Sequence, residues 1–135
     1  MTLTELNLHL DAVMELAEAR DSLRSMRESV MRAQTYDAMP HGTGVSDKVG
    51  KLAILIATQE DEVARLERIV EAGEKDIQAF INTIPDIRTR TIFRLRFLCG
   101  YAWGAVANIG GWSSENAVKA TCYRYLESTG DLFDA

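Results

Sequence analysis

One apolar repeat through the middle of the chain constrains the fold more than any other feature. Its members are spaced alternately four and three residues apart, and they are Leu52, Ile56, Gln59, Val63, Leu66, Val70, Gly73, Ile77, Phe80 and Ile84. This heptad spacing predicts one long helix with a continuous stripe along one face. Gln59 and Gly73 are its weak layers. An exposed stripe of this length would aggregate, so another helix must cover it.

The nearest cover is the beginning of the chain, where a helix is predicted from about Thr4 to Gln34. Thr2 and Glu5 have the spacing of a capping box. The apolar positions follow the helical repeat with one phase shift, and they are Leu3, Leu6, Leu10, Val13 and Ala17, then Leu16, Leu23, Met26, Val30 and Ala33. Two such helices would pack antiparallel as an intramolecular coiled coil. A homodimer through the same stripe, over residues 46–84, is the competing arrangement, and the sequence does not decide between them.

Residues 36–46 are predicted to be the loop between these helices. Pro40 ends the first helix, and Gly42 and Gly44 disfavour an early restart. Ser46 is the expected N-cap of the second helix, which would run to about Asn82. The expected fold is therefore all-α, with a long antiparallel helical hairpin over residues 1–83 and a C-terminal helical domain over residues 84–135.

The segment from Ile84 to Leu126 has the residue order of a helix-turn-helix. An arginine-bearing helix comes first, and a short helix follows Gly100. Ala107 supplies the small residue that is needed where two helices of such a motif cross closely. Gly110 and Gly111 then offer a turn that tolerates positive φ.

The last helix of this segment has two unlike faces, and Ser113 or Ser114 can cap it. The apolar face is formed by Val118, Cys122, Tyr125 and Leu126, with Ala117 and Thr121 beside them. The polar face carries the side chains of a recognition helix, since Asn can pair with adenine, and Lys or Arg with guanine or phosphate. The candidate DNA-binding residues are Ser113, Ser114, Glu115, Asn116, Lys119, Tyr123 and Arg124, with Arg90 and Arg94 of the preceding helix. A packed helical corner with a solvated face is the alternative interpretation.

Charge is distributed unevenly along the chain. The formal net charge is −5, which argues against nucleic-acid binding over the whole surface. Residues 1–83 hold nine Lys and Arg against fifteen Asp and Glu, a net of −6, whereas residues 84–126 hold six against two, a net of +4. The basic charge thus lies in the segment with the helix-turn-helix pattern.

The same segment resembles region 4 of sigma-70-type factors. The shared features are an Ile-Pro start, spaced arginines, Leu95-Arg96-Phe97, Gly100-Tyr101, Trp103, Val106-Ala107, a glycine turn, a serine and Val118-Lys119. The chain departs from sigma in one extra residue between Ala107 and Val118 and in a second glycine. From Tyr36 to Leu126 it is similar to small phage and prophage transcriptional regulators of the ArpU and RinA types, which carry a Met-Pro-His-Gly stretch, here Met39 to Asp47. The resemblance implies a regulator that binds promoter DNA and can contact RNA polymerase.

Enzymatic or metal chemistry has little support in the sequence. His9 and His41 lie far apart, and Cys99 and Cys122 are separated by 22 residues without a CxxC motif, so neither a zinc site, a cofactor nor a catalytic residue is predicted. Both cysteines are expected to be buried as small apolar residues. No apolar run approaches the ~20 residues that cross a bilayer, and the N-terminus does not resemble a secretory signal. A cytoplasmic protein is therefore expected.

Two other functions stay open. Small terminase subunits of phage DNA packaging also combine a helix-turn-helix with helical oligomerisation segments. A polymerase-binding helical module without DNA binding of its own would carry the same segment. The modest positive charge of residues 84–126 suits that last possibility, because few phosphate contacts give weak DNA binding.

Overall fold

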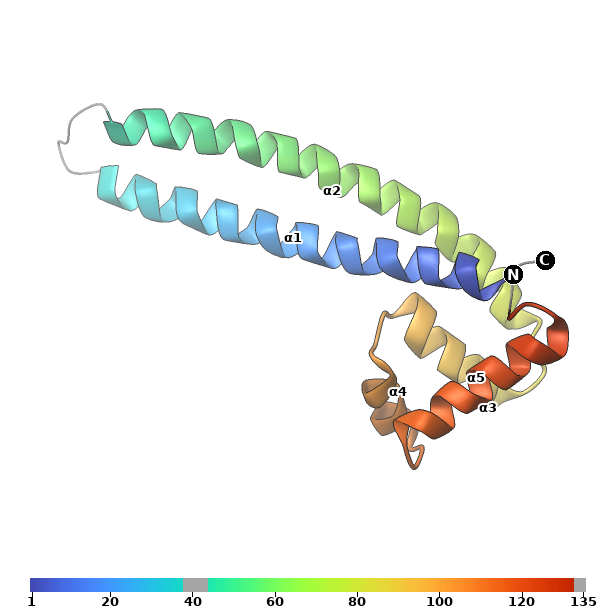
Figure 1. Cartoon of the computed structure of the whole chain (residues 1–135). Coiled ribbons are helices and arrows are strands. Elements are labelled where there is room, and N and C mark those ends of the chain that lie inside the picture. The colour runs from blue at the N-terminus through green and yellow to red at the C-terminus, as the bar shows by residue number, and fades with distance from the viewer. Residues whose placement is uncertain (38–43, 133–135) are drawn as a thin grey trace. The chain divides into compact units, whose positions relative to one another are not determined.

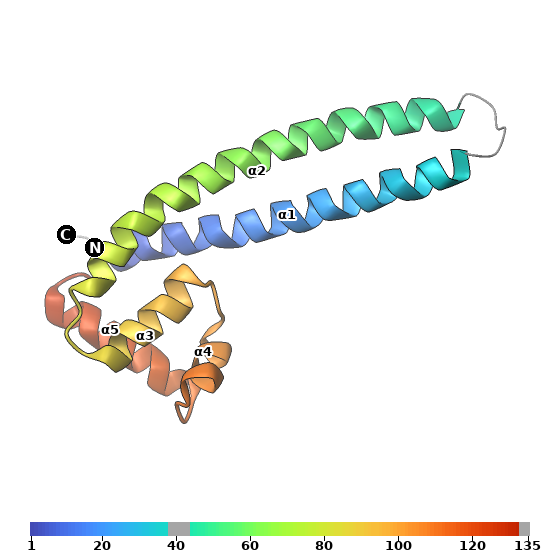
Figure 2. The ribbon, with the colours of Figure 1, turned by 180° about the vertical axis from the view of Figure 1, so that it is seen from behind.

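The computed structural model describes residues 1–37 and 44–132, and all regular structure in these ranges is helical. Its elements are α1 (Leu3–Asp37), α2 (Gly44–Asn82), α3 (Ile87–Phe93), the π-helical segment η1 (Arg94–Leu98), α4 (Trp103–Gly110) and α5 (Glu115–Thr129). Helices α1 and α2 lie side by side and antiparallel in both Figure 1 and Figure 2. The predicted all-α class, with a long hairpin followed by short C-terminal helices, is confirmed.

The ends of the two hairpin helices agree only in part with the ends predicted from the sequence. At the start of α1 the capping box forms, since the Thr2 amide donates to Glu5 Oε2 at 2.8 Å and the Glu5 amide donates to Thr2 Oγ1 at 3.3 Å. The prediction of Ser46 as the N-cap of the second helix is wrong, because α2 already begins at Gly44. Helix α1 also continues to Asp37, beyond the predicted end. Residues 38–43, with most of the Met-Pro-His-Gly stretch, lie outside the described residues.

The heptad stripe of α2 is covered by α1 along its central and C-terminal layers. The members Val63, Leu66, Val70, Ile77 and Ile84 are all buried. The weak layer at Gln59 contains a polar contact between the two helices. The Gln59 side-chain amide donates to the carbonyl of Ala19 at 3.1 Å. The predicted antiparallel hairpin therefore accounts for the stripe. A homodimer through residues 46–84 stays a prediction.

The stripe of α1 differs from the prediction at three residues. Ala17, which was placed on it, is exposed, whereas His9 and Ala19 are buried. With these two residues included, the spacing of three and four continues from Leu6 to Leu23. The sequence missed them because a histidine and one alanine among several do not stand out as core residues.

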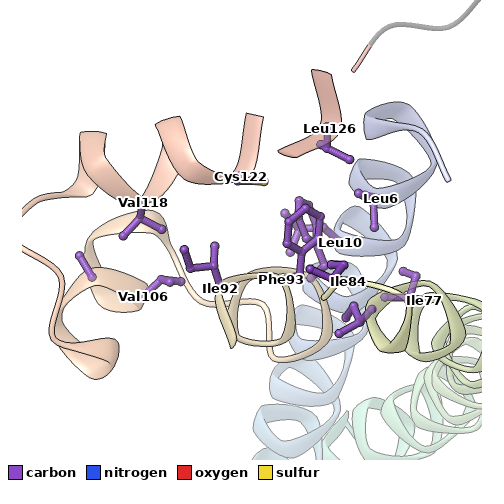
Figure 3. Close-up of a cluster of buried hydrophobic side chains, with 13 residues drawn as sticks. Leu6, Leu10, Ile77, Ile84, Ile92, Phe93, Val106, Val118, Cys122 and Leu126 are labelled. Atoms are coloured by element: carbon purple, nitrogen blue, oxygen red, sulfur yellow. The ribbon is translucent and has the colours of Figure 1, made fainter. Parts of the chain in front are cut away.

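By their contacts, the described residues form two compact units, one of Met1–Met14 with the chain from Ile69 onward, and one of Glu15–Arg68. The predicted division between residues 83 and 84 stays a prediction. The first unit contains an apolar core, in which Leu6 and Leu10 of α1 meet Ile77 of α2, Ile84 just after α2, and side chains from α3, α4 and α5 (Figure 3).

Aromatic rings extend this core in the first unit. Phe93 has its ring centroid 5.8 Å from Phe80, 5.8 Å from Tyr125 and 5.6 Å from Phe97. The two ends of the unit also join, since the Leu3 amide donates to the carbonyl of Asp131 at 2.9 Å. In the described part of the chain, none of the helices is long and apolar enough to span a membrane.

Candidate nucleic-acid interface

The first helix of the candidate motif begins at a well-formed cap. Asp86 Oδ2 accepts from the Thr89 amide at 3.1 Å and from the Thr89 hydroxyl at 2.8 Å. These hydrogen bonds stabilise the charged carboxylate and lower the pKa of Asp86. They hold α3 in place at its N-terminus, directly after Pro85.

The arginine-bearing segment was predicted to be one continuous helix. In the structure, α3 ends at Phe93 and the chain widens into the π-helical segment η1. The Cys99 amide donates to the carbonyl of Arg94 at 3.1 Å across this wide turn. Gly100 then leaves the helix with a φ of 78°. Cys99 is exposed at this end, so its predicted burial is wrong. A π-helical turn contains about one residue more than an α-helical turn, and its position cannot be predicted from local sequence.

The turn between α4 and α5 follows the prediction closely. Gly111 is the left-handed C-cap of α4, with φ 76° and ψ 27°, a conformation that glycine adopts at low cost. Gly110, by contrast, is still helical, and a Cβ there would overlap the ring of Trp112. Ala107 is buried, as expected for a close crossing of helices. The two glycines are thus needed for different reasons.

Helix α5 is capped by Ser114, whose Oγ accepts from the Ala117 amide at 3.1 Å. Ser113 is exposed and has no part in this cap. The inner face is as predicted, with Val118, Cys122 and Leu126 fully buried. Burial raises the pKa of the Cys122 thiol to about 12, so this cysteine is a neutral core residue.

The outer face of α5 is open and polar. Glu115, Asn116, Tyr123 and Arg124 are exposed, together with Ser113 and Ser114 before the helix. Lys119 is less free, because its Nζ lies 3.0 Å from Glu115 Oε1 and its side chain is 35% exposed. The structure therefore brings together the candidate residues of α5 on one accessible face, with one internal ion pair.

The arginines of α3 and η1 differ in their freedom. Arg94 is exposed, and Arg90 is half-buried with its Nε buried and without a hydrogen-bond partner. In the described part of the chain, neither is joined to the outer face of α5 by an ion pair or hydrogen bond. Arg88, which was not a candidate residue, stacks over the ring of Trp112 at 5.5 Å. It lies beside the turn that leads into α5.

Trp103 connects η1 with α5. The Arg96 guanidinium lies 4.7 Å above its ring and donates to the carbonyl of Tyr101 at 2.9 Å. On another side, the Trp103 ring meets Tyr123 edge-on, with centroids 6.0 Å apart. Tyr123 is therefore both exposed and held in place. This stack joins η1, α4 and α5, so it was not predicted from the sequence.

Among the described residues, no group of three or more His, Cys, Asp or Glu side chains is arranged to hold a metal ion. Comparison of the chain with family models, curated proteins and solved structures gives no match.

Proposed function

We propose that this protein is a DNA-binding transcriptional regulator of the phage or prophage type, which reads promoter DNA through α5. The observation that carries the proposal is the uncovered polar face of α5, on a helix fixed by the Ser114 cap and the Gly111 turn. A helix presented in this way, with its first turns exposed, matches what a major groove admits.

The side chains of this face would divide their work between base edges and phosphates. Asn116, near the start of α5, has the donor and acceptor pair that reads adenine N6 and N7. Ser113 and Ser114, with the first amides of α5, would contact a phosphate and set the position of the helix. Arg124 adds a cation further along. Glu115 can accept from cytosine N4 once Lys119 turns to the DNA.

The arginines of the preceding helix would contact the flanking backbone. Arg94 is exposed, and Arg90 has a buried Nε without a partner while its residue is half-exposed. With these two arginines the surface has few cations. Affinity would therefore be modest and would fall with salt. The resemblance to sigma-70 region 4 makes RNA polymerase the expected second partner, which would add the missing affinity at a promoter.

The test is a gel-shift of the purified protein against fragments of its flanking genome at low and moderate salt. We expect a discrete shift on one intergenic fragment. Lys119→Ala and Arg124→Ala should each weaken that shift without lowering the melting temperature, since both side chains lie on the outer face. Arg68→Ala in the hairpin removes the same charge away from α5 and serves as the matched control.

Each other outcome points to a different function. If Arg68→Ala weakens the gel-shift as much as the α5 variants do, net charge alone accounts for DNA binding. That result would overturn the recognition-helix assignment. If no fragment shifts but RNA polymerase is bound, the protein is a polymerase-binding module. A ring-sized particle that binds phage packaging sites would indicate a small terminase.

A further inference from the structure

A groove of about 570 Å³ runs between α1 and α2 within the unit Glu15–Arg68. Its floor is apolar and is made by Leu23 of α1 and by Val63 and Ala64 of α2. Long charged side chains form its two walls. An apolar floor between charged walls is the general composition of a surface that another helix can cover.

The two walls carry opposite charges. The α1 wall is basic, with Arg20, Arg24 and Arg27, whereas the α2 wall is acidic, with Glu60 and Glu67. Arg20 pairs with Glu67 at 3.1 Å and Arg27 pairs with Glu60 at 3.2 Å, so these residues face each other at matching levels across the groove. All four of these side chains remain about half exposed. Such surface pairs contribute little and can be rearranged at low cost.

Arg24, at the centre of the basic wall, has no carboxylate across the groove. Its pairing is with Asp21 of its own helix at 3.3 Å, and both side chains are 70% exposed. The groove therefore holds one more cation than its acidic wall matches. Arg24 lies between the levels of Glu60 and Glu67, so a second acidic wall with the same spacing would place a carboxylate on either side of it.

The core of this unit is thin. Its buried apolar residues are Leu16, Ala19, Leu23, Val63 and Leu66. The stripe members Leu52 and Ile56, further along α2, are only half-buried, and Ile54 and Leu55 are 68% and 54% exposed. Two helices alone leave this part of the hairpin incompletely covered, which favours association.

We propose that this groove is the interface of a homodimer in which the hairpins of two copies pack against each other in parallel. A two-fold axis along the hairpin places α1 of one copy opposite α2 of the other at the same level, so that each basic wall meets an acidic wall. A two-fold axis across the hairpin would instead place α1 against α1 and bring arginines together. Charge complementarity therefore selects the parallel pairing.

The pairing leaves the heptad stripe between α1 and α2 within each chain, so it differs from a dimer through residues 46–84. It also does not depend on DNA binding. The charged walls span only about 10 Å, from the helical rise between Arg20 and Arg27. Interfaces of this small class are weak, so the dimer should depend on protein concentration and weaken with salt.

Complementary charge reversals test the proposal on the full chain. One variant carries Arg20→Glu, Arg24→Glu and Arg27→Glu, which makes both walls acidic, and the other carries Glu60→Lys and Glu67→Lys, which makes both walls basic. Light scattering after size-exclusion chromatography gives the mass, and circular dichroism gives the helix content. We expect a dimer of the unaltered protein, monomers of each variant alone, and a 1:1 dimer in their equimolar mixture.

The mixture separates association from hairpin stability, because mixing does not repair the pairs within either chain. The control variant carries Glu62→Arg and Arg65→Glu, which reverses an ion pair of α2 outside the groove. It should leave the dimer intact. The single change Arg24→Glu disturbs only an exposed pair within α1, and it should weaken the dimer several-fold without loss of helix content. A wild-type protein that stays monomeric up to about 0.5 mM would overturn the proposal. So would a dimer that none of the groove variants affects.

Discussion

His9 of α1 occupies the space that a side chain at position 73 of α2 would need. A Cβ built on Gly73 would lie 2.5 Å from Nδ1 of His9, and His9 itself is only 7% exposed. The glycine in the heptad stripe is therefore not an empty layer, because the imidazole of the facing helix fills it. At this level the large side chain comes from α1 and the small residue from α2.

Replacing Gly73 with alanine should destabilise the protein, although alanine is the better helix former. The added methyl must displace a buried ring, and overpacking of this kind costs about 1–3 kcal/mol, against a gain in helix propensity of at most about 1 kcal/mol. We expect a net loss of about 1 kcal/mol, and at most about 2 kcal/mol, in urea unfolding. Gly50→Ala is the control, since nothing lies within 4 Å of a Cβ at that exposed helical position, and it should stabilise. A Gly73→Ala protein as stable as Gly50→Ala would show that His9 does not fill the space beside position 73.

The burial of His9 also makes stability depend on pH. Desolvation lowers the pKa of His9 from its usual 6.5, and the nearby carboxylate of Glu74 only partly opposes this. Above pH 6.5 the ring is neutral in both the folded and the unfolded chain. Below it the unfolded chain takes up the proton first, so the free energy of unfolding falls as the pH approaches the folded-state pKa.

The check is urea unfolding at about pH 7.5, 6.5 and 5.5 for the wild type and for His9→Gln, which does not titrate in this range. Acid effects on the carboxylates occur in both proteins and cancel in the comparison. We expect the stability advantage of the wild type over the variant to shrink as the pH falls. Parallel pH profiles would show that the fold does not shift the pKa of His9.

Several parts of this architecture could be predicted because they depend on local rules. The stripe of α2 is a heptad repeat of mostly apolar residues, and the capping box at Thr2, the turn at Gly111 and the cap at Ser114 each depend on a few adjacent residues. The fit of His9 against Gly73 could not be predicted, because it requires knowing which residues of two helices face each other.

The same distinction holds within the candidate site. The outer face of α5 follows from helical periodicity, and the Glu115 and Lys119 pair is an ordinary i,i+4 contact that periodicity also allows. The π-helical turn η1, in contrast, depends on packing, since Arg96 at its centre stacks on Trp103 of the next helix. The error at Cys99 follows from that turn.

The cap of α5 can be tested with two neighbouring serines. Ser114→Ala removes the acceptor for the Ala117 amide and should cost about 1 kcal/mol of stability. Ser113→Ala changes an exposed residue outside the cap and should have little effect. Thermal unfolding of both variants distinguishes them, and equal melting temperatures would mean that the cap does not stabilise the fold.

A charge within the stripe should unfold the hairpin. Val63→Asp places a carboxylate at a position that is buried against α1, and an uncompensated buried charge costs about 3–5 kcal/mol. Circular dichroism should show a large loss of helix or a strongly lowered melting temperature. Thr58→Asp puts the same group on the exposed side of α2 and should be tolerated. A folded and unchanged Val63→Asp protein would mean that this stripe faces water.

The ion pair between Lys119 and Glu115 should restrain DNA binding by α5. Glu115→Gln removes the carboxylate that lies 3.0 Å from Lys119 Nζ, so the ammonium becomes available to a phosphate. Affinity for non-specific DNA should rise several-fold, and the slope of log K against log salt should steepen by about 0.9, the value for one added phosphate contact. Glu127→Gln makes the same change in net charge at the exposed end of α5, outside the candidate surface, and should change the slope much less. Fluorescence anisotropy with a labelled duplex over a salt series measures both, and equal slopes for the two variants would show that Lys119 does not contact the DNA backbone.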